Sequence, residues 1–282
     1  MRESRWFRSL RTNRSAIVGV VLVTTAIVLA FAGPELSPRL PDQQFSEGLS
    51  ELGVPRGPSA DFLLGNDAVG RDELARLLHG GRVSLMVALL ATTIAVVLGL
   101  GVGLAAGYFG GLLDGAAMRA IDTLLSLPFL LIAIAVHRAI ASPGVATLCV
   151  LLGCLSWPAL ARVTRTKVMQ VRRQEFVLAA MALGGGSARI LLLHVMPNVL
   201  GPAVILGTGM VADMIVVESA MSFLGLGVAP PRASWGSMLY ESRELMAHAP
   251  HLLVAPGVMI VLTVLGFNLL GEGLRDALDP RG

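Results

Sequence analysis

Long apolar stretches alternate with short polar ones along this chain. Six stretches have the length and composition of membrane spans, because a helix needs about 20 apolar residues to cross a hydrocarbon core of about 30 Å. Each span must be helical, since lipid offers no hydrogen-bonding partner to a bare peptide group. The pattern predicts an all-α integral membrane protein with six transmembrane helices. The stretches cover residues 16–32, 83–106, 121–136, 145–163, 199–217 and 252–270.

The third stretch is the shortest and contains Pro128. Proline lacks the backbone N–H that a helix interior requires. We therefore expect this span either to extend into the membrane interface or to be kinked at the proline.

Glycines recur every fourth residue in the second stretch, at Gly99, Gly103 and Gly107. Together with Gly101 they resemble a degenerate dinucleotide fingerprint, but an apolar helix offers no βαβ unit to place it in. A four-residue repeat of small residues instead makes a smooth helix face. We predict close packing of another helix against it.

The composition agrees with a membrane protein. Hydrophobic residues make up 54% of the chain and charged residues only 15%, whereas about a quarter of a soluble domain is charged. The basic residues lie beside the apolar spans rather than along a groove with interleaved aromatic residues, so they indicate membrane orientation and not a nucleic-acid partner.

Two basic clusters predict the orientation, because cytoplasmic segments are enriched in arginine and lysine. With six spans, both clusters fall on one side, so both termini should be cytoplasmic. A cleaved signal peptide ending at residues 30–32 is the competing interpretation of the N-terminus, although its apolar run is long for one. The clusters are Arg2, Arg5, Arg8, Arg11 and Arg14, and then Arg162, Arg165, Lys167, Arg172, Arg173 and Arg189.

A hairpin of small residues between the fourth and fifth spans, 164–198, is the most informative segment. Residues 175–183 can form a short helix that the glycines 184–186 end. Ser187 is then expected to cap a second helix that runs to Met196, before Pro197. The short side chains leave the backbone open to close approach by another protein.

Several segments, in order along the chain, resemble the dipeptide, oligopeptide and nickel permease group of type I ATP-binding-cassette importers, whose transmembrane domain is MetI-like. The hairpin is similar to the cytoplasmic "EAA" loop of these permeases. One departure is Leu178, which stands where the group usually has an acidic residue. The other similar segments are residues 64–72, 81–85, 107–111, 222–227, 230–236 and 267–280.

The resemblance implies an N-terminal region, 1–82, with a cytoplasmic arm, the first span and an outer loop, and a five-helix permease core, 83–282. It implies as partners a second permease subunit, two ATP-binding subunits and an extracytoplasmic substrate-binding protein, in a bacterial or archaeal cytoplasmic membrane. The residues it places in the ATPase-coupling loop are Glu175, Ala179, Ala180, Gly184, Arg189, Pro197 and Asn198.

ATP and Mg²⁺ would be bound by the partner ATPase subunits. The one lysine, Lys167, follows Thr166 and does not stand in a phosphate-binding loop. Because no hydrolytic motif is found either, we expect a non-catalytic subunit with no cofactor.

The fifth span contains Asp213, with Glu218 near its outer end. A carboxylate at the bilayer centre costs about 2.5–3.5 kcal/mol, so each should face protein or water. Met210, Asp213, Met214 and Val217 recur at helical spacing and are, with Glu218, candidate residues lining a pathway. The alternative for Asp213 is a hydrogen bond to a neighbouring helix. Glu218 matches an acid of the resembled group, which allows a structural role beside the turn 222–227 as an alternative to substrate contact.

His248 and His251 have the spacing to share a helical face and a divalent metal. No third ligand is fixed by spacing, and Pro250 interrupts the helix, so we predict no metal site.

Peptide import is the leading functional hypothesis. Import of nickel or a metal chelate by the same architecture is the alternative within the group. An ion-coupled carrier or channel that uses Asp213 and Glu218, or an anchor that only organises partners, are alternatives of other classes.

Overall fold

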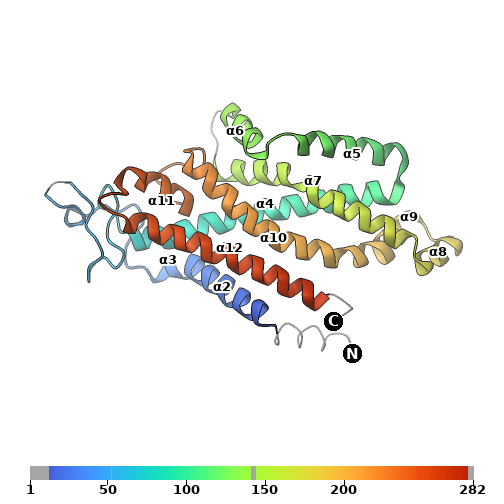
Figure 1. Ribbon diagram of the computed structural model, residues 1–282, viewed down its shortest axis with the longest axis horizontal. Helices are drawn as coiled ribbons and strands as arrows, with labels where there is room; N and C mark the ends of the chain where they lie inside the picture. The colour runs from blue at the N-terminus through green and yellow to red at the C-terminus, as the bar shows by residue number, and fades with distance from the viewer. Residues whose placement is uncertain (1–12, 52, 141–143, 279–282) are drawn as a thin grey trace.

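The computed structural model describes residues 13–51, 53–140 and 144–278 as a long bundle of helices (Figure 1). The bundle helices are α2 (Arg14–Phe31), α4 (Glu73–Phe109), α5 (Gly111–Ser126), α6 (Phe129–Ala139), α7 (Val145–Arg172), α10 (Met196–Phe223) and α12 (His251–Leu278). The connecting elements are α3 (Gly33–Leu36), η1 (Ser46–Gly48), α8 (Glu175–Ala182), α9 (Ser187–Ile190), a π-helical turn (Leu191–Val195), α11 (Trp235–Ser242) and η3 (Arg243–Leu245).

The predicted all-α membrane fold is confirmed. Five helices are long and apolar enough to cross a membrane: α2, α4, α7, α10 together with the short helical segment before it, and α12. The remaining predicted span, 121–136, falls on α5 and α6, which together are apolar enough to be a sixth span.

The kink predicted at Pro128 is also confirmed. α5 ends at Ser126, and Pro128 is the residue that precedes α6. The two helices meet at 90°. They lie along one side of the bundle and reach the rest of the chain mainly through α4 and α7 (Figure 1).

α4 begins ten residues before the predicted start of the second span. The Asp72 carboxylate caps it by accepting from the backbone N–H groups of Leu74 and Ala75 at 2.9 and 3.2 Å. At 1.5 Å per residue its 37 residues span about 55 Å, well beyond a hydrocarbon core of about 30 Å. The division proposed at residue 82 therefore falls within an unbroken helix.

The glycine face packs as the four-residue repeat predicted. α4 and α7 make the largest contact between helices. A Cβ atom at Gly103 would lie 2.7 Å from the carbonyl oxygen of Ala161, and one at Gly107 would lie 2.8 Å from that of Arg165. Only glycine permits this close approach of the two backbones.

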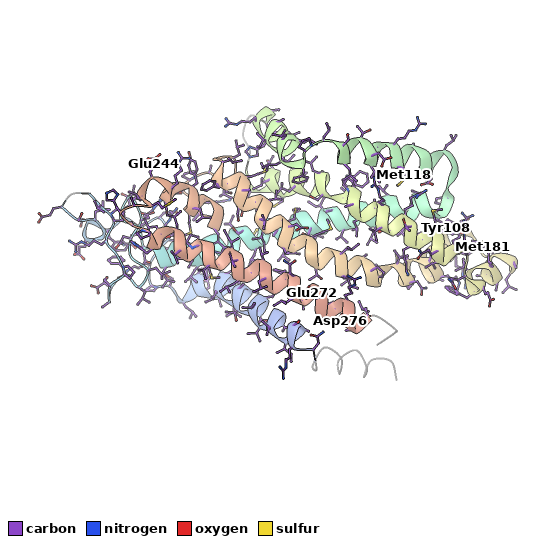
Figure 2. The ribbon with its side chains drawn as sticks, in the orientation of Figure 1. Tyr108, Met118, Met181, Glu244, Glu272 and Asp276 are labelled. Carbon is purple, nitrogen blue, oxygen red and sulfur yellow. The ribbon has the colours of Figure 1, made fainter. Side chains whose placement is uncertain are left out.

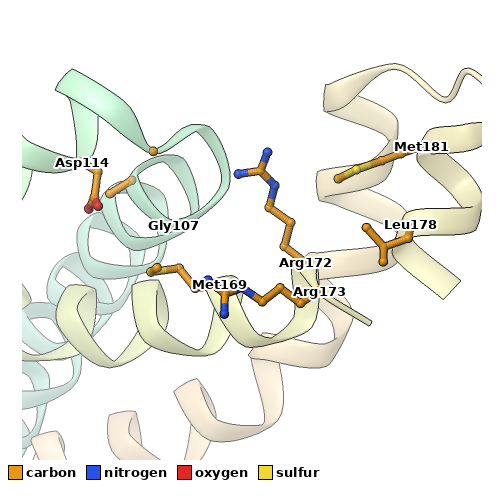
Figure 3. A pocket seen from close by; sticks show the side chains of 9 residues that line it. Gly107, Asp114, Met169, Arg172, Arg173, Leu178 and Met181 are labelled. Atoms are coloured by element: carbon orange, nitrogen blue, oxygen red, sulfur yellow. The ribbon is translucent and has the colours of Figure 1, made fainter. Parts of the chain in front are cut away.

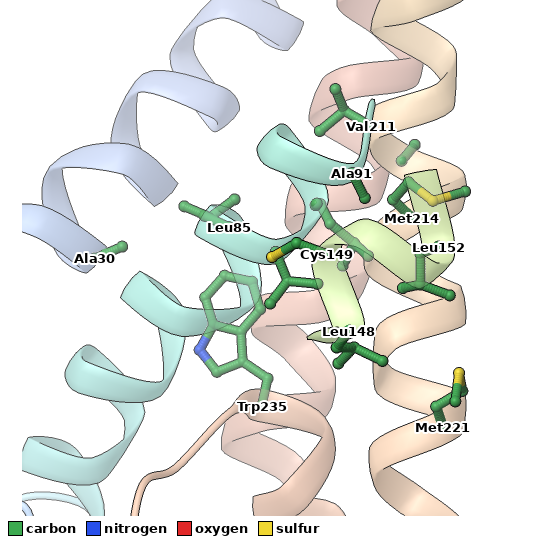
Figure 4. Close-up of a cluster of buried hydrophobic side chains, with 14 of the residues drawn as sticks. Ala30, Leu85, Ala91, Leu148, Cys149, Leu152, Val211, Met214, Met221 and Trp235 are labelled. Carbon is green, nitrogen blue, oxygen red and sulfur yellow. The ribbon is translucent and has the colours of Figure 1, made fainter. Parts of the chain in front are cut away.

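Two hydrophobic clusters hold the bundle together. The larger one joins α4, α7, α10 and α11 around Leu85, Leu152, Ile215 and Trp235; Leu85, Leu152 and Trp235 are labelled in Figure 4. The smaller one lies where α8 and α9 meet the ends of α4 and α7.

The two ends of the bundle differ in which connections they carry. α8 and α9 lie at one end, and α3, the loop 37–72 and α11 at the other (Figure 1). Met181 and Glu244 mark these two ends in Figure 2.

α2 begins and α12 ends toward the α8 end (Figure 1), and the Asn13 side-chain amide donates to the Asp276 carboxylate at 2.7 Å. The N-terminal arginines Arg2, Arg5, Arg8 and Arg11 lie outside the described residues.

Candidate coupling loop, pathway face and outer junction

The predicted coupling loop is built on α8, a short helix with one buried side chain. Val177 is fully buried, while Glu175 and Ala179 are exposed and Ala180 is partly buried. Glu175 is in the first turn, where a negative charge is favourable next to the helix N-terminus. α8 therefore presents small side chains and one carboxylate outward and anchors itself inward with a single valine.

Gly184 ends α8, as predicted. Its φ is +77°, a left-handed conformation that glycine adopts without strain. The N–H of Gly184 donates to the carbonyl of Met181 at 3.0 Å, and the N–H of Gly185 donates to that of Ala180 at 3.1 Å. A Cβ at Gly184 would meet nothing within 4 Å, so the backbone is open to a neighbouring surface.

Two details predicted for the second half of the loop are wrong. Ser187 does not cap α9: it is the first helical residue, and Gly186 precedes it without any side-chain cap. The helix also does not stop before Pro197. It continues from Ser187 to Phe223, and a π-helical turn, Leu191–Val195, lies directly before Met196 and Pro197.

This continuity joins the loop to the fifth span directly. The π-helical turn takes the chain from α9 into α10, and the Asn198 side-chain amide donates to the carbonyl of His194 at 2.7 Å across the join. Arg189, on α9, is exposed.

The side chains that fix the hairpin were not identified from the sequence. Val177, Ile190, Val195 and Val199 are at most 2% exposed and pack with residues of α4 and α7, including Val168. The four-residue spacing of Val195 and Val199 was the available signal, but it is obscured because nearly every neighbouring residue is apolar as well.

The five residues proposed to line a pathway differ in burial. Asp213 is exposed on the surface of this chain, and Met210 and Val217 are partly exposed. Met214 is 4% exposed and faces α7, where the Ser156 hydroxyl donates to its sulfur at 3.6 Å. Asp213 therefore lies at the exposed edge of the predicted face and Met214 at its buried edge.

Glu218 is fully buried and joins three helices. The Ser84 hydroxyl of α4 donates to its Oε2 at 3.0 Å, and the Ser222 hydroxyl donates to its Oε1 at 2.8 Å. The Ser84 oxygen in turn accepts from the backbone N–H of Trp235 at 3.1 Å. These contacts agree with the structural role that was the alternative for Glu218 beside the turn 222–227.

Trp235 completes this outer junction, which we define as Ser84, Glu218, Ser222, Ser234 and Trp235. The indole is 1% exposed, and its Nε1–H donates to the carbonyl of Leu77 in α4 at 3.0 Å. A Cβ at Gly81 would lie 2.8 Å from the ring, so the glycine makes room for the indole. The sequence segments 81–85, 222–227 and 230–236 thus meet in one place.

Segment 64–72 forms an ion-paired clasp beside the junction. Asp67 accepts from Arg71 at 2.5 Å and pairs with Arg76 at 3.3 Å. Both arginines also reach Glu241 of α11, at 2.6 and 2.9 Å. Since Arg76 is only 1% exposed, the clasp ties the loop 37–72 to α4 and α11 through a buried charge.

The two histidines considered as metal ligands do not share a helix. His251 is the first residue of α12, and His248 precedes the helix in an exposed turn. Within the described part of the chain, no group of three or more His, Cys, Asp or Glu side chains is placed to hold a metal ion.

Two family models match the chain. Residues 99–281 match the binding-protein-dependent transport system inner membrane component. Residues 4–52 match the N-terminal transmembrane domain of oligopeptide transport permease C.

Curated relatives align along nearly the whole chain. The dipeptide transport system permease protein DppC of Alkalihalophilus pseudofirmus is 38% identical over 98% of this chain and 88% of its own length. The di/tripeptide transport system permease protein DppC of Pseudomonas aeruginosa is 37% identical over 98% of this chain and 91% of its own length. The glutathione transport system permease protein GsiD of Escherichia coli is 37% identical, with 98% and 89% covered.

A solved structure has the same fold. An inward-facing structure of the MetNI methionine ABC transporter matches with a TM-score of 0.58 and 19% identity, over 72% of this chain and 96% of the matched chain. The first family model covers well over half of the residues, and the relatives exceed 30% identity over most of their length. The chain belongs to the family of binding-protein-dependent transport system inner membrane components.

Proposed function

We propose that this chain is one permease subunit of an ATP-driven importer that moves dipeptides or oligopeptides across a bacterial or archaeal cytoplasmic membrane. The observation that carries the proposal is identity of 37–38% along 98% of the chain with permeases of dipeptide, di/tripeptide and glutathione transport systems. The subunit itself is non-catalytic in this proposal. Two separate ATPase subunits bind ATP and Mg²⁺, and an extracytoplasmic binding protein delivers the peptide.

The geometry of α8 supports its role as the contact for an ATPase subunit. Glu175 and Ala179 are exposed, and the Gly184 backbone has free space around it. Since helical backbone leads from Ser187 through the π-helical turn into α10, a displacement of the hairpin is carried directly into the fifth span. The loop can transmit only the difference in binding free energy between the inward-open and outward-open states.

The exposure of Asp213 supports a pathway or subunit interface on that side of α10. A carboxylate at the bilayer centre costs about 2.5–3.5 kcal/mol, so it is not left against lipid. The second permease subunit, a water-filled pathway between the two subunits, or both cover this face in the proposal. Met210 and Val217 are partly exposed and belong to this exposed face of α10. Met214 and Glu218 are buried within the subunit and are not part of the exposed face.

The bundle end that carries α8 is cytoplasmic in this proposal, and both termini lie on that side. Residues 164–198 carry several basic side chains, as expected for a cytoplasmic segment. The opposite end, with the loop 37–72 and α11, then faces the extracytoplasmic binding protein.

Site-specific crosslinking from the loop tests the coupling role. Cys149 and Cys154 are first replaced by alanine, and a single cysteine is then introduced as Ala179→Cys. A bifunctional crosslinker is expected to join this position to a co-expressed ATPase subunit. Leu63→Cys, at a residue that is 64% exposed in the outer loop, is the matched control and should give no such product. Normal uptake without any crosslink from position 179 would disprove the coupling role.

Uptake by cells tests the substrate and the energy source. Labelled dipeptide should accumulate only when the chain, its partner permease and the ATPase subunits are all present. Ala179→Trp should reduce uptake at least tenfold because the large ring prevents close docking, whereas Ala179→Ser should not. Accumulation of nickel instead of peptide would support the alternative substrate, and accumulation without ATPase subunits would support an ion-coupled carrier.

A further inference from the structure

A cavity of about 270 Å³ lies where the coupling helix meets the bundle. It is open at the junction of the end of α4, the start of α5, the last turns of α7 and α8 (Figure 3). The lining residues are Ala106, Gly107, Gly110, Asp114, Met169, Arg172, Arg173, Leu178 and Met181.

The charged groups of the cavity leave an excess of positive charge. Asp114 is neutralised by Arg165, which donates to both of its carboxylate oxygens. Arg172 and Arg173 remain, and neither forms an ion pair with a carboxylate of residues 13–51, 53–140 or 144–278. These two guanidinium groups, whose side chains extend in different directions from α7 (Figure 3), therefore have no carboxylate partner within the described chain.

Arg172 is positioned across the cavity. Its guanidinium lies 5.3 Å from the centre of the Tyr108 ring, which orients it by a cation–π contact. Figure 3 shows it extending between the helix that carries Gly107 and the helix that carries Met181. A guanidinium held in this way is suited to bind a phosphate through two parallel hydrogen bonds.

The walls of the cavity are apolar, and so is its rim. Met169, Leu178 and Met181 line it. On the adjoining turn between α4 and α5, Phe109 is 57% exposed and Leu112 is 94% exposed. A ligand that fits both the charge and the walls has an anionic group attached to an apolar body.

We propose that this cavity binds the headgroup of an anionic phospholipid of the cytoplasmic leaflet. Arg172 and Arg173 contact the phosphate, and the acyl chains lie along the apolar rim. Basic pockets between transmembrane helices at the cytoplasmic surface have this binding chemistry. The inference rests on the proposed function for the placement of α8 at the cytoplasmic surface.

The position of the ligand gives it an effect on coupling. Leu178 and Met181 belong to α8, whereas Met169 and Arg172 belong to α7. A bound headgroup contacts both helices at once and holds the hairpin against the bundle. Anionic lipid is therefore expected to stabilise one position of the coupling helix.

Native mass spectrometry of the whole purified transporter tests the proposal. The probes are phosphatidylglycerol, phosphatidylcholine and inorganic phosphate, each titrated separately. Phosphatidylglycerol should bind clearly more tightly than phosphatidylcholine. The double variant Arg172→Gln and Arg173→Gln should lose about thirtyfold in phosphatidylglycerol affinity, since each basic residue near a membrane surface contributes about 1 kcal/mol.

A matched control comes from the opposite end of the molecule. Arg243 lies 4.2 Å from the centre of the Tyr240 ring, much as Arg172 lies over Tyr108. The control double variant Arg232→Gln and Arg243→Gln should leave phosphatidylglycerol binding unchanged. The charge-conserving double variant Arg172→Lys and Arg173→Lys should bind more tightly than the glutamine variant and less tightly than the unmodified protein, because the charge remains while the paired hydrogen bonds of the guanidinium are lost.

Three results would overturn the proposal. Equal binding of both lipids would show that the cavity is not selective for an anionic headgroup. Saturation by inorganic phosphate without preference for the lipid would identify a site for free anions. Loss of the ATPase subunits from the glutamine double variant would assign the arginines to that protein interface. Binding is measured as mass on the complex, so it is independent of whether peptide is transported.

Discussion

The two ends of this bundle are built in opposite ways. At the end that carries α11, many charged and polar side chains are buried and bonded to other side chains of the same chain: Glu218 accepts from two serines, and Arg76 pairs with two carboxylates. A few buried polar atoms there, such as Oε1 of Glu73, have no hydrogen-bond partner. At the α8 end, small and apolar side chains are exposed. Phe176 is 47% exposed and Leu183 is 89% exposed.

The difference indicates which surfaces the chain completes by itself. Burying polar groups is favourable only where each group has a partner, and the outer junction supplies most of those partners internally. The α8 end is anchored by a few valines and leaves its outward surface without contacts. We infer that the outer junction sets the shape of the subunit, whereas the coupling end acquires its final contacts from other molecules.

The largest loss of stability is expected for Trp235→Ala. Removing a fully buried aromatic side chain costs about 3–5 kcal/mol, because a cavity remains and the Leu77 carbonyl loses its partner. The thermal midpoint of the purified transporter, measured by the fraction that stays monodisperse on size-exclusion chromatography, should fall markedly. Phe176→Ala on exposed α8 is the control and should change stability little. Equal effects of the two variants would contradict the contrast between the ends.

Glu218→Ala is expected to cause the next largest loss of stability. It leaves the hydroxyls of Ser84 and Ser222 without their acceptor in a buried site, at a cost of about 1–3 kcal/mol. Glu218→Gln should cost less, because serine hydroxyls rotate and can either donate to or accept from an amide. The same thermal measurement distinguishes the variants. If Gln destabilised as much as Ala, the negative charge rather than the hydrogen bonding would hold the junction.

The spans were predictable from hydropathy because lipid leaves the backbone no other choice than helix. Close packing of some helix on the glycine face of α4 was also predictable, because a glycine at every fourth residue has a direct geometric meaning; that the partner is α7 was not. Both predictions depend on a local sequence pattern, and neither needs knowledge of the remaining chain.

The residues that were misplaced depend on tertiary contacts. α10 is apolar on nearly every side, so spacing alone did not show that Met214 faces α7 while Asp213 faces outward. The start of α4 was placed too late because Glu73 and Arg76 are charged residues in a buried helical turn, where Arg76 is paired with Glu241 of α11. Hydropathy does not detect charges that are satisfied by distant segments.

Gly236→Ala tests how tightly the outer junction is packed by adding a single methyl group there. In α11, a Cβ at this position would lie 2.6 Å from the Cα of Ser219 and 2.7 Å from its carbonyl oxygen. Because backbone atoms do not yield as side chains do, we expect a cost of about 1–3 kcal/mol. Gly101→Ala, at a helical glycine with nothing within 4 Å, is the control and should be neutral or slightly stabilising. Tolerance of alanine at position 236 would show that the outer junction is less tightly packed than the structure indicates.

The smallest effect on stability is expected at the coupling loop, for Gly184→Ala. No atom opposes the added methyl group, so the cost comes only from holding alanine at a φ of +77°, about 1 kcal/mol. Gly186→Ala is the matched control, because Gly186 has a φ of −62° and also has free space around it.

Uptake of labelled dipeptide is the second measurement for these two variants. If the open backbone at Gly184 is where an ATPase subunit approaches, uptake of labelled dipeptide should fall more in the Gly184 variant than its small loss of stability explains, while the Gly186 variant should transport normally. Unchanged uptake at both positions would show that α8 needs no close partner at its end, and the coupling end would then resemble the outer junction in being complete by itself.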